Sequence, residues 1–381
     1  MSEALTLLQK LISIPSVNPM GLPADGPEFF EGRMTDYLEE WLGPLDVELR
    51  RQNVAPGRDN LLATFHAPNP LRHVLLEVHQ DTVPIGGMKV PPFGGLIEGN
   101  RVYGRGACDD KGPMTSMLLA LKRLATERPA NAATVTLALA VDEEFTFLGV
   151  QKLVAEKPKF DAAIVAEPTD LDVVTAHKGG ARWEMTVRGA ACHSSNPRNG
   201  VNAIYRMGRA LGAIERYAAS LFQKTPDPLL GPPTLSVGVI QGGTAVNIVP
   251  DACRILIDRR LVPGETPSEA QADFARYMAQ EAELDFPVEC LPPWLNLPPM
   301  PDAINGPTAE KLRAAVLKRK DSCKLLAEPY GSDASTLHQA GIPSVIFGPG
   351  SIGKAHTDDE FVPLDEVEMA AEILFDFCAG E

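Results

Sequence analysis

The sequence lacks any long apolar run, and this absence excludes the simplest kind of membrane protein. No segment approaches the roughly 18 consecutive apolar residues that a transmembrane helix needs. The first residues, MSEALTLLQKL, lack the basic segment and the small-residue cleavage site of a signal peptide. They instead predict an amphipathic helix with Leu5, Leu8 and Ile12 on one face. We therefore expect neither a membrane partner nor secretion.

Cysteine is scarce and follows no pattern. None of the six cysteines forms a CxxC pair, and their spacing is irregular: Cys108, Cys192, Cys253, Cys290, Cys323 and Cys378. This distribution does not predict disulfides and is typical of buried free thiols in a reducing compartment. The expected location is therefore the cytoplasm.

Positive charge is in deficit. The chain has 35 lysines and arginines against 50 aspartates and glutamates, which gives a formal net charge of −15. A field of this sign repels nucleic acids and anionic lipids, so neither is an expected partner. The same field suits the binding of divalent cations, although a requirement for solubility explains it equally well.

Several familiar catalytic motifs are absent. The segment GRGACD has Asp109 where a third glycine would complete the dinucleotide-binding pattern GxGxxG. The sequence contains no GxSxG nucleophile elbow, no HExxH zinc helix and no Walker A phosphate loop. These absences argue against the common classes of nicotinamide enzyme, serine hydrolase and nucleotide hydrolase.

Length and apolar content predict two domains. A chain of 381 residues is too long for one ordinary core, and 44% of its residues are apolar, which is enough for a sizeable interior. A helix is predicted after Gly112, with Pro113 in its first turn. The expected fold class is α/β, with a mixed, mainly parallel sheet between helices. Its buried strands are predicted at residues 74–78, 135–141, 163–166 and 344–347.

The pattern changes near residue 176, where apolar and polar residues alternate as in an antiparallel sheet with one wet face. The alternating apolar residues are Trp183, Met185 and Val187, then Leu235, Val237 and Val239, then Ile255 and Ile257. Thr266, Pro267 and Glu269 predict a capped helix start. We therefore predict an α+β domain over residues 176–290, inserted into a domain made of residues 1–175 and 291–381.

Histidines and carboxylates follow four of the predicted core strands. They are His79 and Asp81, then Asp142, Glu143 and Glu144, then Glu167, then His356 and Glu360, with Asp109 and Asp110 between the first two strands. Ligands of open α/β sheets bind beyond the carboxyl ends of strands. Two histidines with several carboxylates and no cysteine suit zinc, cobalt or manganese, and they predict a two-metal site. One residue of the Glu143–Glu144 pair could bind metal while the other acts as a general base.

These motifs, in this order and spacing, resemble those of a known family. HQDTVP, GRGACDDKG, DEE, AEPT, GAACHSSNPRNGVNAI, GGTAVNIVP and AHTDDE are similar to segments of the co-catalytic zinc deacylases and peptidases. That family includes acetylornithine deacetylase, succinyl-diaminopimelate desuccinylase and glutamate carboxypeptidase. The resemblance extends from about His79 to Glu360 and implies metal-dependent hydrolysis of a linear amide.

The resemblance also implies roles for individual residues of the catalytic domain. It implies that His79, Asp109 and Glu167 are ligands of one metal. Asp109, Glu144 and His356 are then ligands of the other, so that Asp109 bridges the two metals. Glu143 corresponds to the general base and later proton donor, and Asp81 to the group that orients His79. A cis peptide between Asp109 and Asp110 is implied as well, although such bonds are rare outside proline.

The inserted domain resembles the family's lid, which commonly forms a homodimer. His193 corresponds to a histidine that stabilises the oxyanion, often in the partner's active site. Asn247 corresponds to a substrate-binding asparagine, and Arg260 to an arginine that clamps the substrate carboxylate, with Arg259 as its immediate rival. Residues 330–333 correspond to a segment that lines the site, without an assignable role for each.

The resemblance suggests a small-molecule substrate, an N-acyl-L-amino acid. AHKGG, the HSSNPRNGVNAI segment and GPGSIGKAH are closest to acetylornithine deacetylases, which implies deacetylation of N-acetylornithine in amino-acid biosynthesis. HTDDE resembles carboxypeptidase members instead, and IDRR departs from the usual arginine segment. A succinyl-diaminopimelate desuccinylase and a two-zinc carboxypeptidase or dipeptidase therefore stay open as alternatives.

Overall fold

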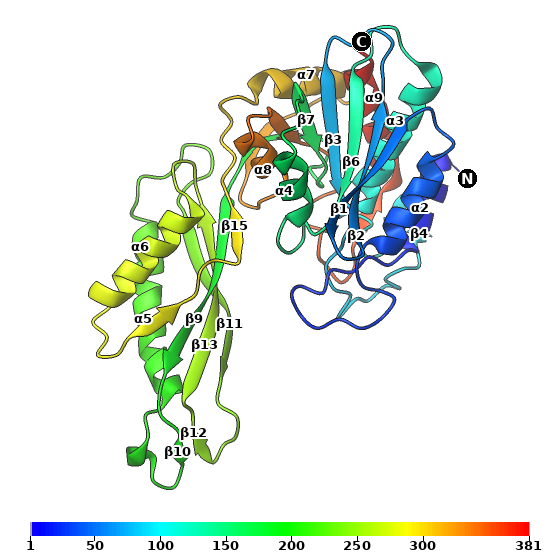
Figure 1. Cartoon of the computed structure of the whole chain (residues 1–381). Coiled ribbons are helices and arrows are strands. Elements are labelled where there is room, and N and C mark those ends of the chain that lie inside the picture. The colour runs from blue at the N-terminus through cyan, green and yellow to red at the C-terminus, as the bar shows by residue number, and fades with distance from the viewer. Residues whose placement is uncertain (1, 381) are drawn as a thin grey trace. The chain divides into compact units, whose positions relative to one another are not determined.

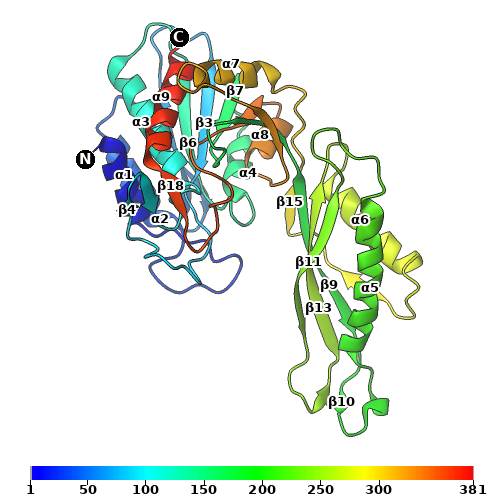
Figure 2. The ribbon, with the colours of Figure 1, turned by 180° about the vertical axis from the view of Figure 1, so that it is seen from behind.

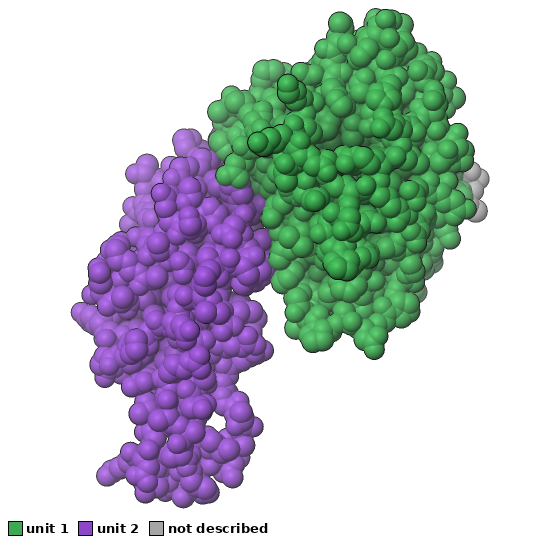
Figure 3. Space-filling view, in the orientation of Figure 1, with its two compact units in different colours: residues 1–175, 301–327, 332–381 green, residues 176–300, 328–331 purple. Residues whose placement is uncertain are grey.

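The computed structural model describes residues 2–380, which divide into two compact units (Figure 3). Of the described residues, the first unit comprises 2–175, 301–327 and 332–380, and the second comprises 176–300 and 328–331. The sequence placed the domain boundaries after residues 175 and 290. The second unit extends further because the strand β15 (Leu295–Leu297) pairs with β9 (Gly179–Arg188).

An eight-stranded sheet forms the centre of the first unit (Figure 1). Its four middle strands run parallel to one another, as the apolar runs predicted, and antiparallel pairs extend the sheet on the side of β1 and β2. The predicted mixed, mainly parallel sheet is therefore confirmed. The strand order is β1 (Glu48–Ala55), β2 (Arg58–Phe65), β6 (Thr134–Ala140), β3 (His73–His79), β7 (Ala162–Val165), β17 (Ser344–Ile346), β8 (Val173–His177) and β16 (Leu325–Glu328).

Helices cover both faces of this sheet (Figures 1 and 2). Buried apolar side chains of α2 (Gly32–Leu42), α3 (Lys111–Glu127), α7 (Gly306–Val316) and α9 (Leu364–Ala379) share one core with the sheet. The helices α4 (Leu148–Ala155) and α8 (Ala334–Gln339) lie on the opposite face. The amphipathic N-terminal helix is confirmed as α1 (Glu3–Ile12), which packs beside a small sheet of β4 (Leu96–Glu98), β5 (Arg101–Tyr103) and β18 (Phe361–Pro363).

The second unit is an antiparallel sheet covered on one face by two helices. The sheet order is β11 (Thr234–Gly242), β13 (Ala252–Leu261), β9 and β14 (Val288–Cys290). Alternate residues of β9 and β13 pack against α5 (Ala203–Leu221) and α6 (Pro267–Gln280). A two-stranded sheet of β10 (Cys192–His193) and β12 (Ile248–Val249) and a short 3-10 helix (Pro197–Asn199) complete the unit.

The alternation predicted for residues 235–239 is interrupted. A β-bulge lies between Val237 and Val239, because these residues pair with the consecutive residues Ile257 and Leu256 of β13. The extra residue, Gly238, moves Val239 off the face that Val237 occupies, and Val239 is 40% exposed. The alternation predicted that Val237 and Val239 share one face of the sheet, and the bulge instead puts them on opposite faces.

Two further sequence-based expectations concern the whole chain. All six cysteines are free, and four of them are buried. Over residues 2–380, none of the helices has both the length and the apolar character that a membrane crossing needs.

Candidate metal centre and active site

The parallel strands bring the predicted ligands to one edge of the first unit's sheet. His79 is the last residue of β3, Glu143 and Glu144 follow β6, and Glu167 follows β7. Because these strands are neighbours and parallel, their carboxyl ends meet at the same edge. His356 reaches the same place from the loop after β17. Chain segments far apart in the sequence thus form one cluster.

Asp109 lies between the two histidines. Its Oδ1 is 2.9 Å from Nε2 of His79, and its Oδ2 is 3.1 Å from Nε2 of His356. Nε2 of His356 is also 3.2 Å from Oε2 of Glu144. One oxygen of Asp109 toward each histidine is the arrangement that a bridging carboxylate requires. The peptide bond between Asp109 and Asp110 is cis, as the resemblance implied.

The donor atoms of this cluster fit metal binding. Ligand atoms of His79, Asp109 and Glu144 lie within 4.8 Å of one another, and so do those of His79, Glu143 and Glu167. Both carboxylate oxygens of Asp110 and Oε1 of Glu144 are buried without a hydrogen-bond partner among the described residues. Unpartnered buried anions are costly unless a cation balances them. Histidine and carboxylate donors without thiolate suit zinc, cobalt or manganese.

The pKa shifts of the clustered carboxyl groups also indicate that this site favours positive charge. Burial, followed by the charges of Asp109 and Glu143, raises the pKa of Glu167 well above its ordinary value. Burial also raises the pKa of Glu143 well above the ordinary range, and the nearby Glu144 adds to the shift. Burial opposes ionisation of Asp109 too, but hydrogen bonds from His356 and His79 lower its pKa below the ordinary value. A bound cation would therefore favour the ionised forms of carboxyl groups whose ionisation burial opposes.

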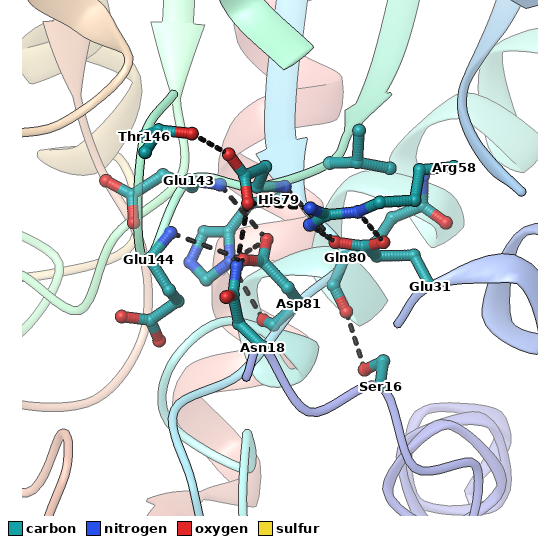
Figure 4. A network of polar contacts seen from close by, with 12 residues as sticks. Ser16, Asn18, Glu31, Arg58, His79, Gln80, Asp81, Glu143, Glu144 and Thr146 are labelled. Atoms are coloured by element: carbon teal, nitrogen blue, oxygen red, sulfur yellow. Dashed lines mark hydrogen bonds and ion pairs between the residues drawn. The ribbon is translucent and has the colours of Figure 1, made fainter. Parts of the chain in front are cut away.

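Asp81 holds both His79 and the chain that carries the two glutamates (Figure 4). Nδ1 of His79 is 3.0 Å from the main-chain oxygen of Asp81 and 3.6 Å from its carboxylate Oδ1. The orienting contact is thus closest through the backbone rather than through the carboxylate that the sequence suggested. The carboxylate instead accepts the backbone N–H groups of Glu143 and Glu144, at 3.2 and 3.3 Å.

Glu360 fixes the chain before the bridging aspartate. Its Oε1 accepts the backbone N–H groups of Cys108 and Asp109, at 2.9 and 3.1 Å. Its Oε2 accepts from Nη1 of Arg105 at 2.5 Å, and both side chains are buried. The sequence showed Glu360 close to His356 but gave no indication of this role, because the partner segment lies some 250 positions earlier in the chain.

The segment of residues 330–333 is divided between the units. Ser332 and Asp333 are buried in the first unit, at 0% and 1% exposure. Burial and the neighbouring Glu77 raise the pKa of Asp333 well above its ordinary value. The charge of Asp333 in turn raises the pKa of Glu143. Asp333 therefore belongs to the same group of interacting carboxylates, although it makes no contact that identifies it as a ligand.

His193, Asn247 and Arg260 belong to the second unit. His193 and Ile248 are partners in the β10–β12 ladder, and the backbone oxygen of Asn247 accepts from the N–H of Ser194 at 3.0 Å. His193 and Asn247 are exposed neighbours at this end of the unit. Nδ1 of His193 is 2.7 Å from the hydroxyl of Ser195, which leaves its other ring nitrogen available.

The register of β13 separates the two adjacent arginines. Arg259 shares the helix-covered face with Ile257, is 1% exposed, and pairs with Glu265 at 2.7 Å. Arg260 lies on the other face, where its side chain is 31% exposed and contacts Asp258 at 2.8 Å. Of these two arginines, Arg260 is thus the one that a ligand can reach.

The polar groups behind the cluster were not predicted. Asn18, Glu31, Arg58 and Asp142 form a buried network that reaches Asp81. Asn18, Glu31 and Arg58 come from different parts of the first 58 residues and lie outside the recognised motifs, whereas Asp142 opens the DEE motif but had no predicted role in it.

Comparison with known proteins places the chain in a family. Residues 75–379 match the model of peptidase family M20/M25/M40. An acetylornithine deacetylase of Myxococcus xanthus is 33% identical over 360 residues, covering 91% of this chain and 92% of that protein. An acetylornithine deacetylase of Vibrio campbellii is 28% identical, with coverage of 97% and 96%.

The fold agrees with solved structures of the same family. An M20 family metallo-carboxypeptidase of Sulfolobus solfataricus superposes with a TM-score of 0.80 at 20% identity, covering 100% of this chain and 99% of that one. A dinuclear metal-binding peptidase of the M20 family from Bacillus subtilis gives a TM-score of 0.68 at 18% identity, with coverage of 99% and 96%. Sequence and fold together show that the chain belongs to peptidase family M20/M25/M40 and is a metallohydrolase.

Proposed function

We propose that the protein hydrolyses the amide bond of an N-acyl-L-amino acid, with N-acetylornithine as the first candidate substrate. The observation that carries this proposal is the cluster, buried except for His356, in which Asp109 contacts both histidines and Glu143 stands beside it. The candidate substrate comes from the curated relatives, which are acetylornithine deacetylases at 28% and 33% identity. These relatives span nearly the whole chain.

Two divalent ions, most simply zinc, would be held by residues of the first unit. His79, Asp109 and Glu167 would hold one ion, and Asp109, Glu144 and His356 the other, with cobalt or manganese as substitutes. Such ions polarise a carbonyl and lower the pKa of water. Asp81 keeps His79 and the Glu143–Glu144 backbone in place for this purpose.

Glu143 is the proposed general base. Its raised pKa suits a carboxyl group that accepts a proton from the attacking water and returns it to the leaving amine. Attack of the water oxygen on the acyl carbon forms the new C–O bond, and the C–N bond breaks as the amine is protonated by Glu143. The products are a carboxylic acid and the free amino acid.

The second unit would supply substrate contacts. Arg260 can offer a guanidinium to the α-carboxylate, whereas Arg259 is already enclosed with Glu265. We propose that His193 stabilises the oxyanion and that Asn247 binds substrate, because both are exposed on one end of the unit. These three roles follow the family resemblance.

A peptidase is the main competing function. The solved structures of similar fold include a carboxypeptidase and a tripeptidase, and the segment HTDDE resembles carboxypeptidase members. A succinyl-diaminopimelate desuccinylase is the other alternative. The three candidate functions differ in the acyl group that is cleaved from the amine, which is acetyl, succinyl or aminoacyl.

The test is amine release by zinc-loaded or cobalt-loaded protein from N-acetyl-L-ornithine. Parallel reactions contain N-succinyl-diaminopimelate, other N-acetylamino acids and simple dipeptides, and Glu143→Gln protein serves as the inactive control. Preference for acetylornithine supports the proposed substrate. Turnover of a dipeptide alone would discard the deacetylase assignment and keep the metallohydrolase.

We also propose a homodimer formed through the second unit, in a reducing cytoplasmic compartment that keeps the six thiols free. The edge strand β11 exposes Val239 and Ile240, at 40% and 53%, and Val246 beyond it is fully exposed. Exposed apolar edge strands invite pairing with a second chain. Sedimentation velocity should show a dimer, and Ile240→Asp should shift the population to monomer.

A further inference from the structure

Arg58 lies at the centre of a buried ionic network behind the active-site edge of the first unit (Figure 4). Its Nε donates to Oε2 of Glu31 at 2.7 Å, and Nη2 donates to Oε1 of the same carboxylate. Its Nη1 lies 2.8 Å from Oδ1 of Asp142. Glu31 and Asp142 are 0% and 1% exposed, and the side chain of Arg58 is 12% exposed. The guanidinium therefore joins two carboxylates that water scarcely reaches.

Asn18 connects this ionic group to Asp81. Its Nδ2 donates to Oδ1 of Asp142 at 3.0 Å and to Oδ2 of Asp81 at 2.8 Å. Asp81 in turn accepts the backbone N–H groups of Glu143 and Glu144. A continuous chain of contacts thus runs from Arg58 to the two glutamates proposed as base and ligand.

The backbone of Asp142 needs this support. Asp142 has φ of 68°, in the left-handed region that residues with a side chain seldom adopt. Its N–H donates to Oε1 of Glu31 at 3.2 Å, its carbonyl accepts from the N–H of Phe147 at 2.7 Å, and its carboxylate binds Arg58 and Asn18. The contacts on all three groups hold the chain in the turn from which Glu143 and Glu144 extend. A small shift of Asp142 would move both glutamates.

The charges make Arg58 difficult to replace. Glu31, Asp81 and Asp142 are all buried, and the guanidinium contacts two of them directly and the third through Asn18. A buried carboxylate that loses its cation repels its neighbours and rearranges or takes up a proton. Rearrangement or protonation would weaken the contacts that hold Asp142 and, through Asn18, those that hold Asp81.

We propose that Arg58 is a positioning residue for the metal centre, acting through Asp142 and Asn18 on Asp81 and on the Glu143–Glu144 turn. Among the described residues, the hydrogen bonds and ion pairs of Arg58 are with Glu31 and Asp142 and not with the proposed metal ligands. The effect on turnover rests on the proposed function, whereas the effect on metal affinity does not. Groups behind the ligands of metal sites characteristically change metal affinity or activity when they are removed.

The experiment compares Arg58→Met, Arg58→Lys and a matched control, Arg51→Met. Arg51 lies on the adjacent strand β1 and pairs with three carboxylates, Asp36 and Glu39 at 2.7 Å and Asp59 at 3.6 Å. None of its ion pairs among the described residues is with Asp81 or Asp142. Zinc and cobalt dissociation constants are measured by competition with a chromophoric chelator. The visible spectrum of the cobalt-loaded protein, kcat, KM and urea unfolding are recorded for each variant.

Arg58→Met is expected to weaken metal binding and to lower kcat by about 10- to 100-fold each, with KM within about threefold of the parent. Its cobalt spectrum should change, because the ligand positions shift. Arg58→Lys keeps the charge but not the two-pronged contact, so it should recover part of the loss. Arg51→Met should keep the parent's metal affinity, spectrum and kcat, whatever stability it loses.

Folded Arg58→Met protein whose metal affinity, cobalt spectrum and kcat equal those of Arg51→Met would overturn the proposal. If Arg58→Met does not fold, Asn18→Ala decides, because it removes the link to Asp81 and keeps the ion pair of Arg58 with Glu31. Weaker metal binding in Asn18→Ala supports the proposal, and parental binding overturns it. Failure of the whole substrate panel would count against the proposed function only, since metal affinity and the spectrum are still measurable.

Discussion

Two adjacent arginines have opposite environments because successive residues of a strand face opposite sides of the sheet. Arg259 is enclosed with Glu265, whereas Arg260 is accessible. The sequence left both as candidates for the carboxylate clamp, because a shift of one residue exchanges them and no local pattern fixes the register. The pairing of β13 with β9 and β11 fixes the register, so that the side chain of Arg260 is the accessible one of the two.

Arg260→Met should raise KM by about 10- to 100-fold and leave kcat close to the parent value, because it removes a charge-assisted contact made equally in ground and transition states. Arg259→Met should instead lower the free energy of unfolding, since it leaves Glu265 without its buried partner. Steady-state kinetics and urea unfolding of both variants distinguish these effects. A rise in KM confined to Arg259→Met would show that Arg259, and not Arg260, binds the substrate carboxylate.

Glu143→Gln keeps the shape of the proposed base and removes its ability to take a proton. Turnover should fall by about 100- to 10,000-fold, and the bound metal should be retained. Glu156→Gln, at an exposed ion pair with Arg50, is the control. Metal content by elemental analysis and single-turnover rates provide the measurement. Near-parental turnover would remove Glu143 from the role of base.

The sequence located the residues at strand ends much better than the residues behind them. His79, Glu143 and Glu167 follow apolar runs that are recognisable as parallel strands, and the geometry of a sheet brings such ends together. Arg58 and Asn18 are close to Asp81 only through packing of segments that the sequence does not relate. Contacts set by regular secondary structure can be predicted from pattern, whereas contacts set by the docking of loops cannot.

Among the elements, the helix α6 shows how local rules suffice where no distant partner is involved. It begins at Pro267, as Thr266, Pro267 and Glu269 predicted. The hydroxyl of Thr266 accepts the N–H of Glu269 at 3.3 Å and lies 2.6 Å from that residue's carboxylate. By contrast, the bulge in β11 depends on how an edge strand fits its neighbour, and the alternation of residues 235–239 did not reveal it.

Thr266→Ala should lower the free energy of unfolding by about 1 kcal/mol, because the first turn of α6 loses its side-chain cap. Ser268→Ala, two positions further on at an exposed site of the same turn, is the control and should be neutral. Urea unfolding followed by far-ultraviolet circular dichroism gives the comparison. Equal stability of the two variants would mean that the cap contributes nothing measurable.

For the whole molecule, metal and proton compete for the same carboxylates. Burial and like charge raise the pKa values of Asp110, Glu143 and Glu167 in the folded, metal-free protein. A carboxyl whose pKa is raised by folding stabilises the folded state at low pH, and this contribution is lost as the pH rises through the raised value. Bound cations offset this loss of stability, so metal should stabilise the folded protein more in alkaline than in acidic solution.

Metal should therefore raise the melting temperature of the chelator-treated protein more at about pH 8 than at about pH 5.5. We expect this increase to be ~5 °C larger at the higher pH. Differential scanning calorimetry at both pH values provides the test. A double variant of His79 and His356 lacks one proposed ligand of each ion, so its melting temperature should gain little from metal at either pH value. An equal rise in the melting temperature of the parent protein at both pH values would contradict the proposed competition between metal and protons.

The insertion of the second unit into the first has a consequence for the order in which the protein is made. The sheet of the first unit needs β17, at residues 344–346, between β7 and β8. Apart from residues 328–331, the second unit is complete at residue 300. A ribosome that synthesises the chain from its N-terminus therefore delivers the second unit almost whole while the first still has a gap in its sheet. Because His356 emerges later still, a nascent chain cannot assemble the full set of proposed ligands until synthesis is almost finished.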